Sequence, residues 1–377
     1  MIVVNENTCI GCEACVNICP KKCITMKQNS EGFYLPVVNK DECINCSACN
    51  RVCICEQKIS AENSLLNCYA AISKKDDERM KSSSGGVFSL LADYILANNG
   101  IVYGASFSED LSVHHIRVSN KDDLKKLRGS KYVQSHIDNS FLLAKKDLEN
   151  GKRVLFSGTG CQIDSLKLFL QKEYVNLLTV DVACYGVPSE KVWFAYMQCN
   201  KINSLPIEFR NKDIGWLNYS VKYGEKEPIE HSKDLYMNIF LSKLALRNSC
   251  YSCQSKGCNR NSDLTLADFW GIDSIDKEMF DNKGTSLVIV HSEKGQKAFD
   301  SISTNLTFKQ EDVNEAITHN PYIVKSVEKP KARDEFLAEF NQCNPPSLKH
   351  LYNKYVAYYD KNTFQKLKIL IKKLIKF

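Results

Sequence analysis

The stretch CIGCEACVNICPKKC, residues 9–23, determines how the first part of this chain folds. Its first four cysteines are separated by two, two and three residues, and a proline follows the fourth. The same spacing returns in residues 43–53, and the flanking segment VVN recurs as well, at 3–5 and 37–39. The repeat indicates an internal duplication, in which two cysteine-rich loops each contribute to a metal centre.

The repeat resembles the bacterial two-cluster ferredoxin, which implies an α+β ferredoxin-like dicluster module holding two [4Fe-4S] clusters. In that pattern the fourth cysteine of each run binds the cluster of the other run. One cluster would then use Cys9, Cys12, Cys15 and Cys53, and the other would use Cys43, Cys46, Cys49 and Cys19. A pair of zinc sites is the alternative. Zinc sites usually have two separated CxxC pairs, so the spacing favours iron and sulfide.

Three positions beside the repeat need their own interpretation. Ile54 stands where the second run would usually have proline. Cys23 and Cys55 lie outside both runs, and we interpret them as small buried residues in preference to spare ligands. The repeat accounts for residues 1–60 only. The clusters are therefore expected to serve another site within the same chain.

The composition is that of a soluble globular protein. Of the 377 residues, 44% are hydrophobic and 25% are charged, and no apolar run approaches the roughly 18 residues of a membrane span. The N-terminal residues show no signal-peptide pattern, so we expect a cytoplasmic location, where 18 cysteines indicate metal binding. Much of the net charge of +6 lies in the last 17 residues, which gives no indication of nucleic acid binding.

Residues 61–307 predict an α/β domain with a mostly parallel sheet. Segments with strand character alternate with helical segments, as in 101–107 and 153–170. A helix is expected over Val87–Ala97, with serines and glycines before it and a glycine stop after it. From 308 to 377 the sequence becomes polar and helical, which predicts a helical C-terminal region.

Two glycine-containing turns precede predicted helices. The run Ser82–Gly86 can offer hydroxyls and backbone N–H groups to an anion, but a plain N-cap explains it equally well. The segment SGTGCQ (157–162) lacks the full GxGxxG pattern and is a weak nucleotide-binding signal. His114 and His115 are neighbours in a strand, point to opposite faces, and are interpreted as structural.

A further set of cysteines is widely separated in the sequence. Cys161 and Cys184 each follow a predicted strand, while Cys250 and Cys253 form a CxxC pair. Because residues just beyond neighbouring parallel strands share one edge of the sheet, these four thiols can gather there and hold a third cubane. Free cysteines are also common core residues. The spacing alone favours neither interpretation.

Six segments, in order, resemble the family of coenzyme F420 hydrogenase/dehydrogenase beta subunits. They are SSSGGVFSLLADYIL, RGSKYVQS, VLFSGTGCQIDSLK, DVACYGVPS, SCYSC and DLTLADFWGI, between Cys68 and Ser301. The resemblance implies an α/β domain that binds FAD and an iron–sulfur cluster, commonly with a ferredoxin module in front. It also implies electron transfer between clusters and a hydride-type substrate, which is the deazaflavin coenzyme F420 in archaeal and actinobacterial members.

The resemblance assigns roles to individual residues. It implies that a third cluster is held by Cys161, Cys184, Cys250 and Cys253. It implies FAD contacts from Ser82, Ser83, Ser84, Gly85 and Gly86, and from Ser130, Lys131 and Tyr132, with Lys131 balancing the pyrophosphate charge. Two positions depart from the family pattern: Gly160 replaces a usual proline, and Tyr185 replaces a frequent histidine, which puts proton transfer there in doubt. Asp268 and Trp270 are interpreted either as flavin neighbours or as a structural turn.

These features predict an iron–sulfur flavoprotein oxidoreductase in which FAD links one-electron clusters to hydride chemistry. Its partners would be a ferredoxin-like one-electron donor or acceptor and an unidentified substrate, with coenzyme F420 and a biosynthetic intermediate as candidates. No catalytic acid or base is assigned. The alternative is an electron-relay subunit of a larger hydrogenase, dehydrogenase or reductase complex, and a redox sensor is a third interpretation.

The last residues, 361–377, have the pattern of a basic amphipathic helix. Leucine, isoleucine and phenylalanine occupy one side of the helical wheel and six lysines the other, with only Ile369 misplaced. Such a helix can lie on an anionic membrane surface, which would make the protein peripheral at the inner membrane face. Packing of the apolar side on the α/β domain explains the pattern equally well.

Overall fold

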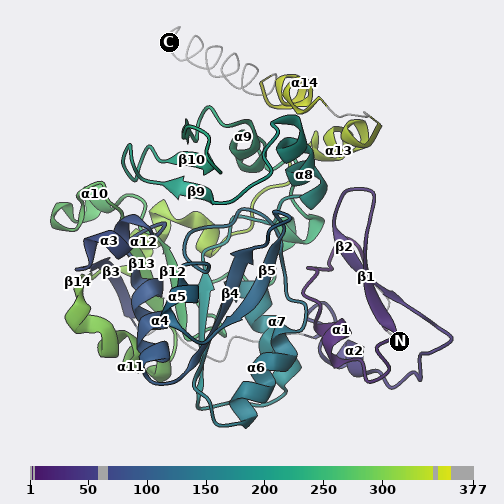
Figure 1. Ribbon diagram of the computed structural model, residues 1–377, viewed down its shortest axis with the longest axis horizontal. Coiled ribbons are helices and arrows are strands. Elements are labelled where there is room, and N and C mark those ends of the chain that lie inside the picture. Colours follow the sequence, from purple (N-terminus) through teal and green to yellow (C-terminus); the bar gives the residue numbers. More distant parts are fainter. Residues whose placement is uncertain (1, 3–4, 58–66, 343–346, 358–377) are drawn as a thin grey trace, which may run out of the picture.

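The computed structural model describes residues 2, 5–57, 67–342 and 347–357, arranged as Figure 1 shows. The N-terminal module contains two short helices, α1 (Ala14–Ile18) and α2 (Ala48–Arg51), and an antiparallel hairpin of β1 (Ile24–Gln28) and β2 (Tyr34–Val38). Each helix begins within a cysteine loop, after a left-handed residue, Glu13 or Ser47. The duplication in the sequence thus produces two equivalent loop–helix units.

The rest of the described chain is built on a nine-stranded mixed sheet with the order β14-β3-β13-β12-β8-β7-β4-β5-β6. The strands are β3 (Asn67–Ser73), β4 (Ile101–Phe107), β5 (Val113–Val118), β6 (Ser135–His136), β7 (Val154–Thr159), β8 (Leu177–Val182), β12 (Leu264–Asp268), β13 (Ser286–Val290) and β14 (Leu306–Gln310). Pairing is parallel from β12 through β8 and β7 to β4, and between β5 and β6.

The remaining four pairings, β4–β5, β12–β13, β13–β3 and β3–β14, are antiparallel. The predicted mostly parallel sheet is therefore confirmed only for its centre. The physical reason is clearest at β4 and β5: a short turn joins them, and a parallel pair would need a long crossover instead.

Helices cover both faces of this sheet. One face carries α4 (Val87–Ala97) and α11 (Glu293–Ile302), packed on residues such as Val102 and Leu155. The other carries α6 (Ser140–Glu149) and α7 (Gly160–Leu170), packed on Tyr103 and Phe156. Neighbouring residues of one strand thus serve opposite layers. The predicted helix over Val87–Ala97 is confirmed, and His115 is a buried residue stacked on Phe156, as its structural interpretation predicted.

A second, three-stranded sheet lies beyond the carboxyl ends of the central strands, near the top of Figure 1. It consists of β9 (Ile207–Asn211), β10 (Ser220–Tyr223) and β11 (Ile229–Glu230). The helices packed with it are α8 (Glu190–Cys199), α9 (Leu235–Leu241), α13 (Arg333–Gln342) and α14 (Leu348–Tyr352). Their shared core is rich in aromatic rings, among them Trp193, Phe209 and Tyr236. This layer covers the edge of the main sheet at which α/β domains usually bind ligands.

The remaining elements are short. They are the helices α3 (Asp76–Met80), α5 (Lys121–Leu124), α10 (Ile272–Ile275) and α12 (Val313–His319), the 3-10 turns Asn248–Ser252, Lys277–Met279, Ser303–Asn305 and Pro321–Ile323, and a π turn at Asn353–Ala357. Within the described part of the chain, no helix has the length and apolar character needed to cross a membrane. The amphipathic tail, 361–377, lies outside the described residues.

The N-terminal module docks on α6 and α7, on the right of Figure 1. Ala14 and Val52 are buried in the same apolar core as those two helices. Polar contacts fix the orientation: Arg333 makes a double ion pair with Glu31, at 2.6 and 2.7 Å. His136 lies between two buried carboxylates, Glu13 of the module and Glu190 of α8. The module is thus packed tightly against the α/β domain.

Candidate functional site

The first cysteine set faces the α/β domain. Cys9, Cys12 and Cys15 come from the first loop, and the chain after α2 returns Cys53 to them. Burial raises the pKa of the Cys12 thiol to about 12, and the nearby Cys9 and Cys53 thiols add to that shift. Burial and the same neighbours also raise the pKa of Cys15. Thiols crowded in this way ionise readily only beside a compensating cation, so the donor set fits an iron–sulfur cluster.

The second cysteine set surrounds one small pocket on the outer side of the module. The pocket is lined by Cys19, Cys43, Cys46 and Cys49, together with Cys23, Ile44 and Val38 among others. Cys49 is buried and Cys46 is exposed. The four cysteines therefore converge, as the ferredoxin resemblance implied, at a place that reaches the protein surface.

The two additional cysteines differ from one another. Cys23 is buried, with its Sγ atom 3.5 Å from that of Cys19, so its interpretation as a small buried residue is confirmed. Cys55 is only half-buried, so the same interpretation is wrong there. Its thiol donates a hydrogen bond to the Thr8 carbonyl at 3.1 Å, in an exposed part of the module. A hydrogen bond from Cys55 also lowers the pKa of Cys53 to about 6.

The third cysteine set assembles at the carboxyl edge of the main sheet. β7 and β8 are parallel neighbours, so Cys161, in the first turn of α7, and Cys184, just past β8, lie at the same edge. Cys250 and Cys253 reach it from the 3-10 turn at Asn248–Ser252. Burial raises the pKa of Cys161, and the three other thiols add to that shift.

Buried thiols that act on one another electrostatically again fit an iron–sulfur cluster. Among the residues that the structure describes, no group of three or more His, Cys, Asp or Glu side chains has the geometry of a single-ion site. The three sets are therefore defined by proximity and chemistry.

Cations surround the third set. Lys256 Nζ donates to the backbone carbonyls of Cys184 and Tyr322. Arg260 pairs with the buried Asp181 and lies against Gly160, where a Cβ atom would be 2.8 Å from its Nη1 atom. The departure from proline at residue 160 thus leaves room for a guanidinium. Burial raises the pKa of Cys184, and Lys256 opposes that shift, which favours thiolate ligands.

The serine-rich loop, Ser82–Gly86, precedes α4 and contacts Ser130. Ser83 Oγ lies 2.8 Å from Ser130 Oγ and accepts a hydrogen bond from the Ser130 N–H group, also at 2.8 Å. Ser84 Oγ donates to the Thr285 carbonyl at 2.7 Å. The N-cap of α4 is Gly86, with φ +88°, and no side chain caps the helix. The plain serine N-cap interpretation is therefore wrong.

Lys131 and Tyr132 follow Ser130 directly in the chain. Lys131 Nζ donates to the carbonyls of Arg128 and Gly129 at 2.8 and 3.2 Å. Desolvation lowers the pKa of Lys131 to about 7, so an anionic ligand would restore its charge. The Tyr132 ring stacks on Phe240 with centroids 5.0 Å apart.

A buried arginine that the sequence analysis missed lies beside Tyr132. Arg210, on β9, is 6% exposed, and its Cζ atom lies 3.9 Å from the Tyr219 ring centre and 5.0 Å from that of Trp270. Its Nη2 atom is 3.2 Å from Asp268 Oδ2. Among the described residues, Arg210 Nε has no hydrogen-bond partner, and Nη2 has none apart from this ion pair. Unsatisfied guanidinium N–H groups at this edge are suited to an anionic oxygen.

An aromatic contact joins the segment that carries Cys184 to Tyr132, two residues after Ser130. Phe240 of α9 packs against Tyr185, which follows Cys184, with centroids 5.4 Å apart, and it also stacks on Tyr132. The Tyr185 hydroxyl donates to the Leu241 carbonyl at 2.9 Å, and burial raises the pKa of Tyr185. In this arrangement Tyr185 holds α9 in place and keeps its proton. No sequence signal distinguished Phe240 from other core aromatics.

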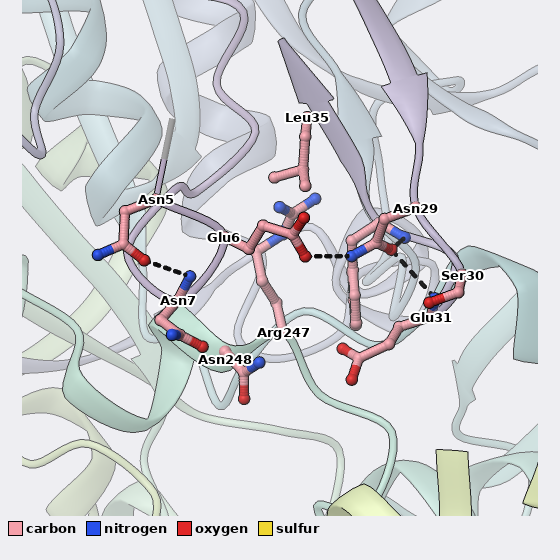
Figure 2. A pocket seen from close by; sticks show the side chains of 10 residues that line it. Asn5, Glu6, Asn7, Asn29, Ser30, Glu31, Leu35, Arg247 and Asn248 are labelled. Carbon is pink, nitrogen blue, oxygen red and sulfur yellow. Dashed lines mark hydrogen bonds between the residues drawn. The ribbon is translucent and has the colours of Figure 1, made fainter. Parts of the chain in front are cut away.

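A polar cavity of 540 Å³ opens between the module and the α/β domain. Figure 2 shows its lining, which comes from the N-terminal segment, the β1–β2 turn and the loop after α9. The lining residues are Asn5, Glu6, Asn7, Asn29, Ser30, Glu31, Phe33, Leu35, Arg247 and Asn248. A hydrogen bond of 3.3 Å between Asn29 and Glu6 crosses it. The cavity adjoins the first cysteine set through Arg247, which bonds to the Cys9 carbonyl.

Comparisons with known proteins match two separate parts of the chain. Residues 8–56 match the 4Fe-4S dicluster domain, which confirms iron–sulfur over zinc for the N-terminal module. Residues 151–316 match the family described as the C terminus of the beta subunit of coenzyme F420 hydrogenase/dehydrogenase.

Two similar proteins come from Methanosarcina species. The F subunit of the F420H2 dehydrogenase of Methanosarcina mazei is 24% identical over 331 residues, which cover 82% of this chain and 86% of that relative. A chain in a solved structure of the F420-reducing [NiFe] hydrogenase complex from Methanosarcina barkeri is 15% identical, with a TM-score of 0.45, and the match covers 73% of this chain and 99% of that one. The chain described here is therefore similar to the C-terminal part of the coenzyme F420 hydrogenase/dehydrogenase beta subunits over residues 151–316, and to the 4Fe-4S dicluster domain over residues 8–56.

Proposed function

We propose that this protein is an iron–sulfur flavoprotein oxidoreductase that links a one-electron partner protein to a hydride-exchanging substrate. The observation that carries the proposal is the succession of three cysteine sets leading to the serine-rich loop. Clusters exchange single electrons, whereas FAD exchanges electrons singly or as a hydride pair. A chain that holds both kinds of group converts one chemistry into the other.

The cysteines of each set would hold one [4Fe-4S] cluster. The second set lies at the surface, where Cys46 is exposed and Ile44 is 57% exposed, and this loop offers a docking point for the partner protein. The first set is covered by α7, where Ser165 supports the Cys12 thiolate. The Ser165 hydroxyl donates to the Cys161 carbonyl at 2.8 Å, so one helix connects the first set to the third.

FAD would lie along the serine-rich loop. The Ser83 and Ser130 hydroxyls and the Lys131 and Arg210 side chains would bind its phosphates, because charge-assisted hydrogen bonds are the strongest available to such oxygens. The Tyr132 ring supplies an aromatic surface. Asp268 holds Arg210 in position, so we propose a supporting role for it, and no residue is proposed as acid or base.

Coenzyme F420 is the hydride carrier that the family description and the M. mazei relative suggest as substrate. That relative is named as a subunit, which favours the second candidate function, an electron-relay subunit of a larger complex. F420 reduction or oxidation by the isolated protein, assayed with an artificial one-electron donor or acceptor, separates the two. A relay subunit would need its partner subunits for activity.

The first prediction concerns cofactor content. Protein purified without oxygen is expected to contain about twelve iron and about twelve acid-labile sulfide, four of each per cubane, and one FAD. Metal analysis, sulfide assay and flavin extraction give these values. A content of about eight iron with FAD present would exclude the third cluster and leave the rest of the proposal in place. Zinc without sulfide, or the absence of FAD after anaerobic purification, would contradict the proposal.

The second prediction concerns FAD binding. Lys131→Met removes a charge-assisted hydrogen bond worth about 1.5–3 kcal/mol, so the Kd for FAD is expected to rise roughly 10- to 150-fold. In the protein without FAD, desolvation lowers the pKa of Lys131 to about 7. The affinity of the wild type for FAD should therefore fall as the pH rises above 7, because the side chain loses its charge. The variant should lack this dependence. Flavin fluorescence titrations of the apoprotein measure both effects, and Lys125→Met, at an exposed position nearby, is the control.

A further inference from the structure

Arg247 lies between the first and third cysteine sets. It follows α9 and precedes Cys250 by three residues, so its backbone belongs to the segment that carries the third set. Its side chain is 2% exposed and extends toward the N-terminal module, as Figure 2 shows. No sequence pattern singled it out.

The contacts of Arg247 join the two sets directly. Its Nη1 atom donates to the Cys9 carbonyl at 3.3 Å, and Nη2 donates to Gln134 Oε1 at 2.6 Å. Both atoms also lie 3.3 Å from the Tyr34 carbonyl. On the other side, the Arg247 carbonyl accepts a hydrogen bond from the Cys250 N–H group at 3.0 Å. One residue thus bonds to the backbone of a cysteine from each set.

The ferredoxin loop is shaped around this guanidinium. Gly11 has φ +68°, and a Cβ atom there would lie 2.8 Å from Arg247 Nη2 and 2.7 Å from Gln134 Nε2. The Phe33 ring covers the other side, with its centre 4.9 Å from Arg247 Cζ. The side chain is therefore held in one position by groups from both domains.

The partners named above are all neutral, although the charge is buried. An isolated buried cation is costly unless a negative group compensates it. Burial lowers the pKa of Arg247, and the thiols of Cys9, Cys250, Cys161 and Cys12 oppose that shift. Glu6 and Glu31 line the same cavity as Arg247, and the thiols that act on this cation belong to the first and third cysteine sets.

We propose that Arg247 is a positioning residue for electron transfer, a fixed positive charge that raises the reduction potentials at the first and third cluster sites together. This inference rests on the proposed third cluster. The transferred electron leaves one cluster and arrives at the other, so no proton or co-reactant is needed. A charge between the sites favours the reduced form at each, since net charge and hydrogen bonding set cluster potentials.

The test is a redox titration of the intact protein, followed by EPR. In Arg247→Gln, the equilibrium constants for reduction at the first and third sites are expected to fall about tenfold, which corresponds to about 59 mV for one electron. The second site is the internal reference and should shift much less. Arg247→Lys keeps the positive charge, so the reduction potentials at the first and third sites should stay close to those of the wild type.

Two further variants make the result decisive. Gln134→Glu places a carboxylate against Arg247 Nη2 and neutralises the charge while the arginine stays in place, so both potentials should again fall. This variant decides the question if Arg247→Gln fails to load its clusters. Arg333→Gln is the matched control, since Arg333 is a buried arginine of the same domain interface that pairs with Glu31. Its removal should leave the three potentials unchanged relative to one another.

Unchanged potentials in Gln134→Glu, or equal shifts at all three sites, would overturn the role of Arg247. About eight iron in the wild-type protein would instead show that the third cluster is absent, which removes the one part of the proposed function on which this inference rests. The iron content of the wild type therefore distinguishes the two failures.

Discussion

Replacing Cys184, a proposed ligand of the third cluster, with serine is expected to block electron transfer to the proposed flavin while the N-terminal clusters remain intact. Cys184 lies just past β8 and directly precedes Tyr185, whose ring contacts Phe240 on the way to the serine-rich loop. Changes in residues that merely support a ligand cost roughly 10- to 100-fold in metal affinity or activity. Loss of a ligand should therefore slow flavin reduction by more than about 100-fold.

Stopped-flow bleaching of the flavin by a reduced one-electron donor measures this rate. EPR of the reduced variant should retain the two N-terminal signals. Cys199→Ser is the matched control, because Cys199 is an exposed cysteine at the end of α8. A wild-type bleaching rate in Cys184→Ser would show that Cys184 is only a packing residue.

The second large effect is expected at His136, where the N-terminal module docks. Its ring nitrogens lie 3.3 Å from Glu13 Oε1 and 3.0 Å from Glu190 Oε1, and both carboxylates are buried. A neutral side chain here leaves two buried negative charges facing one another. Removing one partner from a buried ionic group costs about 3–5 kcal/mol, so His136→Gln should lower the free energy of unfolding by about that amount.

The same contact predicts a pH dependence. Burial disfavours the charged ring, but hydrogen bonds to Glu13 and Glu190 outweigh it and raise the pKa of His136 to about 10. Because the folded pKa lies above the unfolded value of about 6.5, this stabilisation is complete below about pH 6.5 and is lost as the pH rises through about 10. Denaturant titrations between pH 6 and 10.5 should show that loss in the wild type and not in His136→Gln.

Two controls test the electrostatic origin of this effect. His114→Gln should cost less than about 1 kcal/mol, because the Asp138 carboxylate that pairs with His114 is 50% exposed. The double variant His136→Gln/Glu190→Gln should recover part of the lost stability, since one of the two facing charges is gone. Equal losses in the single and double variants would mean that the histidine acts through packing alone.

Much of the N-terminal module could be predicted from the sequence, because most cysteines of each set are close to one another in the chain. Three cysteines of each set lie within one short loop, where the two-residue spacing brings their thiols together. The fourth, Cys53 or Cys19, follows from the ferredoxin pattern, since duplicated loops related by symmetry exchange one ligand. Local spacing also predicted α4, since the apolar residues of 87–97 repeat with the helical period between clear end signals.

The sheet direction could be predicted only in part. The strand–turn–helix segment that contains Cys161 predicted a parallel centre, which β4, β7, β8 and β12 confirm. The antiparallel flanks depend on which strands become neighbours. Pairings such as β3 with β13 join segments more than 200 residues apart. The alternation of apolar and polar residues identifies a strand, but it does not indicate which other strand will pair with it.

The sequence by itself thus predicted the two loop-based cysteine sets, and the family resemblance predicted the residues of the third. Tertiary structure decided that Cys161, Cys184 and Cys250 meet, that Gly160 accommodates Arg260, and that Phe240 joins Tyr185 to Tyr132. It also decided where the buried cations Arg210 and Arg247 lie. A lone arginine has no periodic or spacing signal in a sequence, because its role depends on the charges that the folded chain brings within a few ångströms of it.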